Sequence, residues 1–217
     1  MCAINLKMEW MNKSIYDGRG VFEMIITKTW AMPNSNTFSI KPINSIIERY
    51  IGLLEMEREA CLLEMEREAC LPLCEACLPL CIVDPFARDS KFGTVRNDID
   101  PQYDTEYHLD ATEFLKLLPS SSADMVLYDP PYSARQLTEC YRKLELSVSA
   151  DMTRSDYWTK QKNEIARIMK PSGICLSFGW NSGGIGKSLG FEQIEIMLVA
   201  HGGHHNDTIV TVERKVS

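Results

Sequence analysis

Four consecutive residues, Asp129-Pro130-Pro131-Tyr132, are the chemically most informative stretch of the sequence. They follow the apolar run 125–128, which predicts a buried strand that stops here because proline has no N–H to donate. At such a corner the Asp129 carboxylate and the Pro130 carbonyl can each accept one hydrogen of an exocyclic amine. The ring of Tyr132 offers a stacking face. The stretch therefore predicts a slot for a planar base that has an amino group.

Three further acids stand at the ends of predicted strands: Asp84, Asp98 (with Asp100 as its alternative) and Asp110. Ligands of parallel sheets bind beyond the carboxyl ends of the strands, and carboxylates crowded there repel one another unless a ligand uses them. Ribose hydroxyls and an adenine amine are donors that carboxylates accept well. The acids therefore predict a site for a nucleoside-bearing cofactor, although each one singly could instead cap a helix.

The elements that must position these residues alternate between helices and strands. The apolar spacing in 41–55 (Ile43, Ile46, Ile47, Tyr50, Ile51, Leu54) predicts a helix that begins near Pro42. The remaining predicted elements are strands in 78–84, 93–100, 105–110, 121–129 and 174–180, helices in 110–119 and 154–173, and a hairpin of 191–200 with 207–215. Such alternation predicts a single α/β domain over 1–217, with a mostly parallel sheet and a C-terminal antiparallel hairpin.

Residues 53–81 contain two repeats without a single change. Residues 53–61 (LLEMEREAC) recur at 62–70, and residues 68–74 (EACLPLC) recur at 75–81. Such short, undiverged units do not resemble a solenoid, and they indicate a loop or an artefact of how the sequence was recorded. The duplication also produces the spacing of Cys70, Cys74, Cys77 and Cys81. We therefore expect free thiols in a reducing compartment and no metal site, with a cysteine metal-binding protein as the alternative.

The overall composition indicates a soluble globular protein, with 45% hydrophobic and 24% charged residues. No run of 18 apolar residues is present and the N-terminus does not resemble a signal peptide, so a cytoplasmic protein without a membrane partner is expected. The net charge of −7 opposes a general attraction to nucleic acid. Residues 135–170, however, contain eight Lys or Arg against five acids, which allows a local basic face.

Asp129-Pro130-Pro131-Tyr132 resembles the DPPY motif of amino-methyltransferases that use S-adenosylmethionine to methylate adenine N6 in DNA. The stretches IVDPFARDSKFGTVRNDIDP, YHLDATEFL, NEIARIMKPSGICLSFGW and HGGHHNDTIVTVERK are similar to the small adenine methyltransferases of bacteriophages. PNSNTFSIKPI resembles their upstream cofactor-binding element, so that the resemblance covers most of 31–215 in the expected order. It implies a Rossmann-like class I methyltransferase fold, S-adenosylmethionine as cofactor, and a DNA partner whose target adenine is flipped out of the duplex.

The resemblance also implies a role for individual residues. For the target amine these are Asp129, Pro130, Pro131 and Tyr132, and for the cofactor they are Phe38, Lys41, Asp84, Pro85, Phe86, Asp98, Asp110 and Ala111. Asp84, Pro85 and Phe86 are expected near its methionine part, with Phe38 and Lys41 closing over that end. Asp98 is expected at the ribose, and Asp110 with Ala111 at the adenine ring.

One departure from the family concerns the loop after the first strand, which is usually glycine-rich. Here it reads DPFARDSKFG, with Gly93 as its only glycine, and it leaves room for no more than a turn before the next strand. Since no separate recognition domain of the usual size fits in the chain, substrate recognition is expected from the loops 133–157 and 181–190 or from a partner. Two functional alternatives remain open: methylation of adenine in RNA, and a catalytically inactive nucleotide-binding module. A restriction-modification role in a bacterial or phage-infected cell would fit methylation of adenine in DNA.

Overall fold

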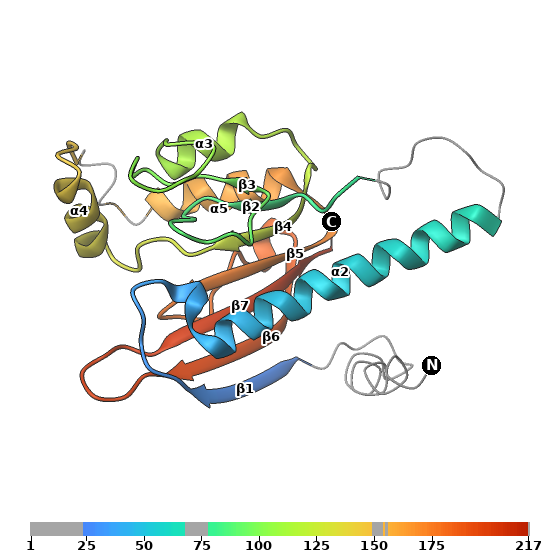
Figure 1. The fold of residues 1–217 in the computed structure, drawn as a ribbon, viewed down its shortest axis with the longest axis horizontal. Coiled ribbons are helices and arrows are strands. Elements are labelled where there is room, and N and C mark those ends of the chain that lie inside the picture. Colours follow the sequence, from blue (N-terminus) through green and yellow to red (C-terminus); the bar gives the residue numbers. More distant parts are fainter. Residues whose placement is uncertain (1–23, 68–77, 149–153, 155, 217) are drawn as a thin grey trace.

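The computed structural model describes residues 24–67, 78–148, 154 and 156–216, and its centre is one seven-stranded sheet (Figure 1). The strand order is β1 (Ile25–Trp30), β6 (Phe191–Ala200), β7 (Thr208–Lys215), β5 (Met169–Gly179), β4 (Ala123–Tyr128), β2 (Ile82–Asp84) and β3 (Val95–Arg96). Only β7 is antiparallel, to both β5 and β6, and the other neighbours pair in parallel. The expected α/β, Rossmann-like architecture with a C-terminal antiparallel hairpin is confirmed.

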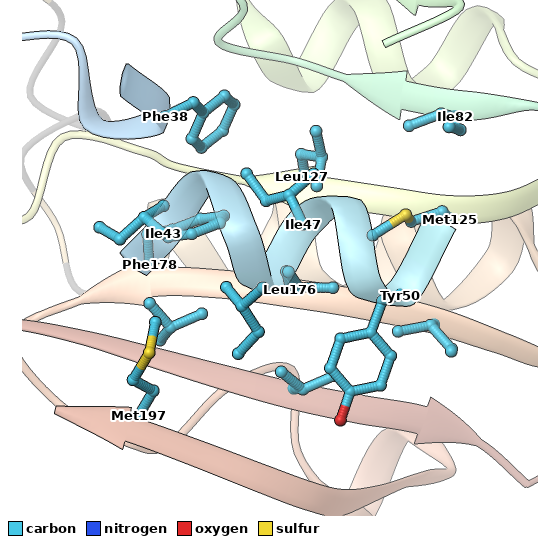
Figure 2. Packing of buried hydrophobic residues seen from close by; sticks show 14 of the residues in the cluster. Phe38, Ile43, Ile47, Tyr50, Ile82, Met125, Leu127, Leu176, Phe178 and Met197 are labelled. Carbon is cyan, nitrogen blue, oxygen red and sulfur yellow. The ribbon is translucent and has the colours of Figure 1, made fainter. Parts of the chain in front are cut away.

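One face of the sheet is covered by helix α2 (Lys41–Arg67) and the short turn η1 (Thr37–Ser39). Ile43 and Ile47 of α2 are fully buried against Met125 and Leu127 of β4 and against further strand residues (Figure 2). The apolar periodicity therefore gave the correct helix and its buried face, because residues three and four apart share one side of a helix.

The opposite face is covered by α3 (Ala111–Leu117) and α5 (Tyr157–Ile168). Val126 and Tyr128, the alternate residues of β4, pack there with Phe114 and Ile165. The continuous apolar run of β4 is thus explained by burial on both faces of a central strand. A further helix, α4 (Ala134–Lys143), lies at the carboxyl edge of the parallel strands (Figure 1).

The duplicated segment differs from the expected loop in the part that the structure describes. Helix α2 continues to Arg67, through the first LLEMEREAC unit and into the second. Leu, Glu, Met, Arg and Ala all favour helix, and Arg214 of β7 holds Glu57 by an ion pair of 2.9 Å. The rest of the duplication, 68–77, including three of its four regularly spaced cysteines, lies outside the described residues.

Several local expectations need correction. The strand expected before Asp110 is reduced to a single bridge between Asn97 and Tyr107. Helix α5 ends at Ile168 and strand β5 begins at Met169, a few residues before Pro171 and Gly173, where the helix was expected to stop. Strand β1 and helix α4 were not predicted. Between β2 and β3 the chain forms only turns, as the loop length had indicated.

Membrane-spanning helices and metal sites were considered for the described residues. No helix within 24–67, 78–148 or 156–216 is long and apolar enough to cross a membrane. Within the same ranges no three His, Cys, Asp or Glu side chains are grouped so as to hold a metal ion.

Candidate active site

A cavity of about 460 Å³ lies at the carboxyl edge of β2, β3 and β4. Its walls come from the loop after β2, the loop after β3, the 129–132 corner after β4, and helix α4 with Tyr157 of α5. A volume of several hundred Å³ is typical of sites for small molecules and cofactors. The segments with the candidate chemistry therefore enclose one common space.

Most of the residues expected from the sequence line this cavity. Those that do are Pro85, Phe86, Asp98, Ala111, Asp129, Pro130, Pro131 and Tyr132. Phe38, Lys41, Asp84 and Asp110 do not line it. Phe38 is buried in the core beside Phe92 and Phe178, and Lys41 is exposed at the start of α2.

The corner after β4 is held by a compact set of hydrogen bonds. The Tyr132 hydroxyl donates to Asp129 Oδ1 at 2.6 Å, and the Thr37 hydroxyl also donates to this carboxylate. The Tyr132 N–H donates to Gln136 Oε1 at 2.7 Å, and the Trp158 indole N–H donates to the Pro131 carbonyl at 3.1 Å. Burial raises the pKa of Asp129, and the bonds from Tyr132 and Thr37 act against that rise. The corner is therefore rigid, with its carboxylate aimed at the cavity.

Helix α4 begins directly after this corner and closes one side of the cavity. Ser133 is its N-cap and accepts a hydrogen bond from the Gln136 N–H at 3.2 Å. Leu137 and Tyr141 form its buried face and pack against Tyr157 of α5. Residues 133–157 were expected to form a loop, so this helix was not predicted.

Asp98 lies in the cavity wall in an orientation fixed by the backbone. Its two oxygens accept the N–H groups of Arg88 at 3.0 Å and Asp100 at 2.9 Å. Burial raises the pKa of Asp98 although these bonds and the Arg88 charge oppose the rise. Each carboxylate oxygen can accept more than one hydrogen bond, so Asp98 keeps lone pairs for the donors of a ligand.

Asn97 organises the same wall and was not predicted. Its side-chain N–H groups donate to the carbonyls of Pro85 and Leu109, both at 3.0 Å, and its oxygen accepts the Leu109 N–H at 2.9 Å. Fully buried Asn97 thereby fastens the loop after β2 to the segment before α3. In the sequence Asn97 stands between Arg96 and Asp98, and no local pattern indicates its bonds to Pro85 and Leu109, which lie 12 residues away on either side.

Asp84 lies beneath the cavity rather than in its wall. It is fully buried, accepts the Phe86 N–H at 3.2 Å, and is also hydrogen-bonded by the Ser90 side chain. Burial raises its pKa well above the ordinary value, and the neighbouring Asp129 and Asp98 carboxylates raise it further. Asp84 therefore shapes the loop that holds Pro85 and Phe86.

Asp110 has the capping role that the sequence left open. One of its oxygens accepts the N–H groups of Thr112 at 2.8 Å and Glu113 at 3.4 Å, as the N-cap of α3. The other accepts the hydroxyls of Tyr141 at 2.6 Å and Tyr157 at 2.8 Å. Asp110 thus ties α3, α4 and α5 together, while the adjacent Ala111 lines the cavity.

The 181–186 loop lies beside the same corner. Buried Glu213 of β7 accepts the N–H groups of Ile185 and Gly186. Trp180, at the start of the loop, makes an edge-to-face contact with Tyr132, with ring centroids 5.6 Å apart. Trp180 remains 42% exposed, so an aromatic surface is held rigidly at the edge of the site.

No protein-family model matches the chain, and no curated protein matches its sequence. Among solved structures, the chain is similar to a Burkholderia thailandensis 1,6-didemethyltoxoflavin-N1-methyltransferase with bound S-adenosylhomocysteine, at 11% identity and a TM-score of 0.43, over 63% of this chain and 71% of that one. It is similar to TrmN from Thermus thermophilus, at 18% identity and a TM-score of 0.40, over 62% and 43% of the two chains.

A third similar structure also comes from Thermus thermophilus and is described provisionally as a DNA modification methylase. Its identity is 16% and its TM-score 0.33, over 49% of this chain and 50% of that one. The chain thus spans about half or less of the length of the two Thermus proteins. These similarities are distant, and the fold assignment rests on the strand order of the sheet.

Proposed function

We propose that this chain is a methyltransferase that transfers a methyl group from S-adenosylmethionine to the N6 amino group of adenine in DNA. The observation that supports this most directly is that the 129–132 corner and Asp98 line the same cavity. The first can hold an exocyclic amine and the second a ribose, so that donor and acceptor of a methyl group would meet within one enclosed space.

The residues present fit such a cofactor. Asp98 offers oriented carboxylate oxygens for ribose hydroxyls, and Ile99 and Leu109 give apolar surface for an adenine ring near Ala111. Pro85 and Phe86 cover the side expected to face the methionine part. The cavity walls therefore offer contacts for the ribose, the adenine and the methionine part of the cofactor.

The chemistry assigned to the corner needs no strong base. An aromatic amine is a weak nucleophile because its lone pair is delocalised into the ring. Asp129 and the Pro130 carbonyl accept its two hydrogens, which localises the lone pair on nitrogen and fixes its direction. S-adenosylmethionine held in this cavity would supply an electrophilic methyl group, whose S–C bond would break as the N–C bond forms. The surplus proton leaves the nitrogen by way of Asp129.

Tyr132 prepares Asp129 for this role. In the structure its hydroxyl donates to Asp129 Oδ1, which favours the ionised carboxylate against the effect of burial. The same bond fixes the Tyr132 ring as a surface on which a flipped base can stack. Near the cavity, the Arg135, Arg142 and Lys143 side chains of α4 supply positive charge for a phosphate backbone on an otherwise acidic protein.

The test is methyl transfer to matched DNA and RNA oligonucleotides, followed by digestion and mass spectrometry of the nucleosides. N6-methyladenine is expected from DNA, and Asp129→Ala should lower its rate of formation by about 100- to 1,000-fold. Asp104→Ala serves as the matched control, because Asp104 is an exposed acid paired only with Lys91 in the described part of the chain. Methylation of RNA in preference to DNA, methylation of cytosine instead of adenine, or full activity of Asp129→Ala would each contradict the proposal.

A further inference from the structure

The backbone of Arg88 has a conformation that residues other than glycine rarely adopt. Its φ is +48°, in the loop after β2 where glycine is absent from the sequence until Gly93. The left-handed region costs an L-residue conformational energy, and such strain is concentrated at functional sites. Of the four described non-glycine residues with positive φ, Arg88 is the one that lines the cavity.

The Arg88 side chain reaches across the mouth of the cavity. Its guanidinium donates to the Ser35 carbonyl through Nη1 and to the Tyr103 hydroxyl through Nε at 3.3 Å and Nη2 at 3.2 Å. Its backbone N–H holds Asp98, and its charge acts on both Asp98 and Asp129. Since a guanidinium has five N–H groups, these contacts use three and leave one on each of Nη1 and Nη2, in a residue that lines the cavity.

The charges that line the cavity are mostly negative. Asp98, Asp100, Asp129 and Glu139 face it, against Arg88 and Lys143 among the described lining residues. A sulfonium amino-acid nucleoside presents hydroxyl, sulfonium and ammonium groups, all of which suit carboxylates, together with a single carboxylate that needs a cation. A planar guanidinium binds a carboxylate with two parallel hydrogen bonds, which a lysine cannot do.

We propose that Arg88 binds the carboxylate of the cofactor's amino-acid part and thereby selects cofactors that have one. Arg88 belongs to the same loop as Pro85 and Phe86, on the side of the cavity where the methionine part is expected. Lys143 stands at the end of α4, on a different wall, and is the less suitable partner. The inference rests on the proposed function, because it needs a sulfonium nucleoside in this cavity.

Isothermal titration calorimetry with two ligands tests this assignment. The first ligand is S-adenosylhomocysteine, and the second is 5′-deoxy-5′-[(3-aminopropyl)thio]adenosine, which lacks only its carboxylate. Arg88→Gly removes the guanidinium and its bonds to Ser35 and Tyr103, while glycine adopts the positive φ of this position without strain. Lys116→Ala is the charge-matched control, since Lys116 lies on α3 and pairs with Glu113.

Arg88→Gly should weaken S-adenosylhomocysteine binding by about 10- to 100-fold, the effect of removing a hydrogen-bonded charge partner. Binding of the aminopropyl compound should change by less than about threefold. Lys116→Ala should bind both ligands as the wild type does. Equal weakening of both ligands would mean that Arg88 only fastens its loop, and unchanged binding of both would also overturn the assignment. A wild-type protein that binds neither ligand would refute the proposed function itself, and this inference with it.

Discussion

Replacing Asp110 by alanine should destabilise the protein far more than the loss of an ordinary helix cap. The carboxylate accepts two backbone N–H groups of α3 and the hydroxyls of Tyr141 and Tyr157. Loss of the cap costs about 1 kcal/mol. Each buried hydroxyl left without an acceptor adds about 1–3 kcal/mol. Because Tyr141 and Tyr157 are 5% and 6% exposed, water cannot readily replace the carboxylate. Because the Tyr141 and Tyr157 hydroxyls also hydrogen-bond each other, one of them keeps an acceptor, and the expected loss is about 2–4 kcal/mol in the free energy of unfolding.

The measurement is urea unfolding at neutral pH, followed by circular dichroism. Ser133→Ala is the matched control, because it removes the N-cap of α4, which has a single side-chain bond to Gln136. It should cost about 1 kcal/mol. Tyr141→Phe and Tyr157→Phe should each cost an intermediate amount, about 1–2 kcal/mol. If Asp110→Ala were no more damaging than Ser133→Ala, the tyrosine bonds would contribute nothing and the linkage of the three helices would be disproved.

Asp110 also makes a prediction about acid stability. Burial acts to raise its pKa, but the hydrogen bonds from Tyr141, Tyr157 and Thr112 outweigh burial and lower it. A carboxylate with a lowered folded-state pKa stabilises the fold above its unfolded pKa of about 3.9, and that contribution is lost as the pH falls through the folded value. Asp110→Asn, which cannot ionise, should therefore lose less stability than the wild type between neutral pH and pH 3. Parallel losses in the two proteins would contradict this reasoning.

Two further predictions concern the loop between β2 and β3. Gly93→Ala should cost about 1–3 kcal/mol in urea unfolding, because the new Cβ would lie 2.8 Å from Asp84 Cβ and 2.9 Å from Arg96 Cγ. Gly52→Ala, with nothing within 4 Å of its new Cβ, should instead stabilise α2 slightly, and equal effects of the two substitutions would show that the contact is absent. Because burial raises the pKa of Asp84, wild-type stability should fall as the pH rises from the unfolded value towards the folded one. Asp84→Asn should remove that part of the slope above the unfolded pKa of about 3.9, and an unchanged slope would contradict a raised pKa of Asp84 in the folded protein.

Much of the fold follows from local patterns in the sequence. The run 125–128 is buried on both faces of β4, and the spacing of Ile43 and Ile47 identifies the buried face of α2. Strand β1 gave no such signal because its residues alternate poorly and most are exposed at the sheet edge, where pairing with β6 comes from distant sequence. The extension of α2 to Arg67 was not predicted, because the exact repetition of the sequence in 53–81 suggested a loop. The high helix propensity of its residues points to the helix that is present.

The candidate site was only partly predictable. Parallel strands present their carboxyl ends at one edge of the sheet, and this rule correctly predicted that Asp98 and Asp129 lie close together, since both line one cavity. It could not distinguish Asp110, because Tyr141 and Tyr157, which occupy its second oxygen, are 31 and 47 residues away in the chain. Arg88 gave no signal of its own within the glycine-poor loop after β2, since a φ value cannot be read from a sequence.

The four strand-end acids separate into two kinds by their electrostatics. The pKa values of Asp84, Asp98 and Asp129 are raised, in each case chiefly by burial, so ionising these carboxyl groups in the folded protein costs stability. The pKa of Asp110 is lowered, because hydrogen-bond donors from three helices surround it. The ionised Asp110 carboxylate stabilises the fold, whereas ionised carboxylates at the other three positions do not. Carboxylates that are buried at one sheet edge at the expense of stability are expected at a binding site. There a ligand with hydrogen-bond donors and positive charge provides the partners that the protein lacks.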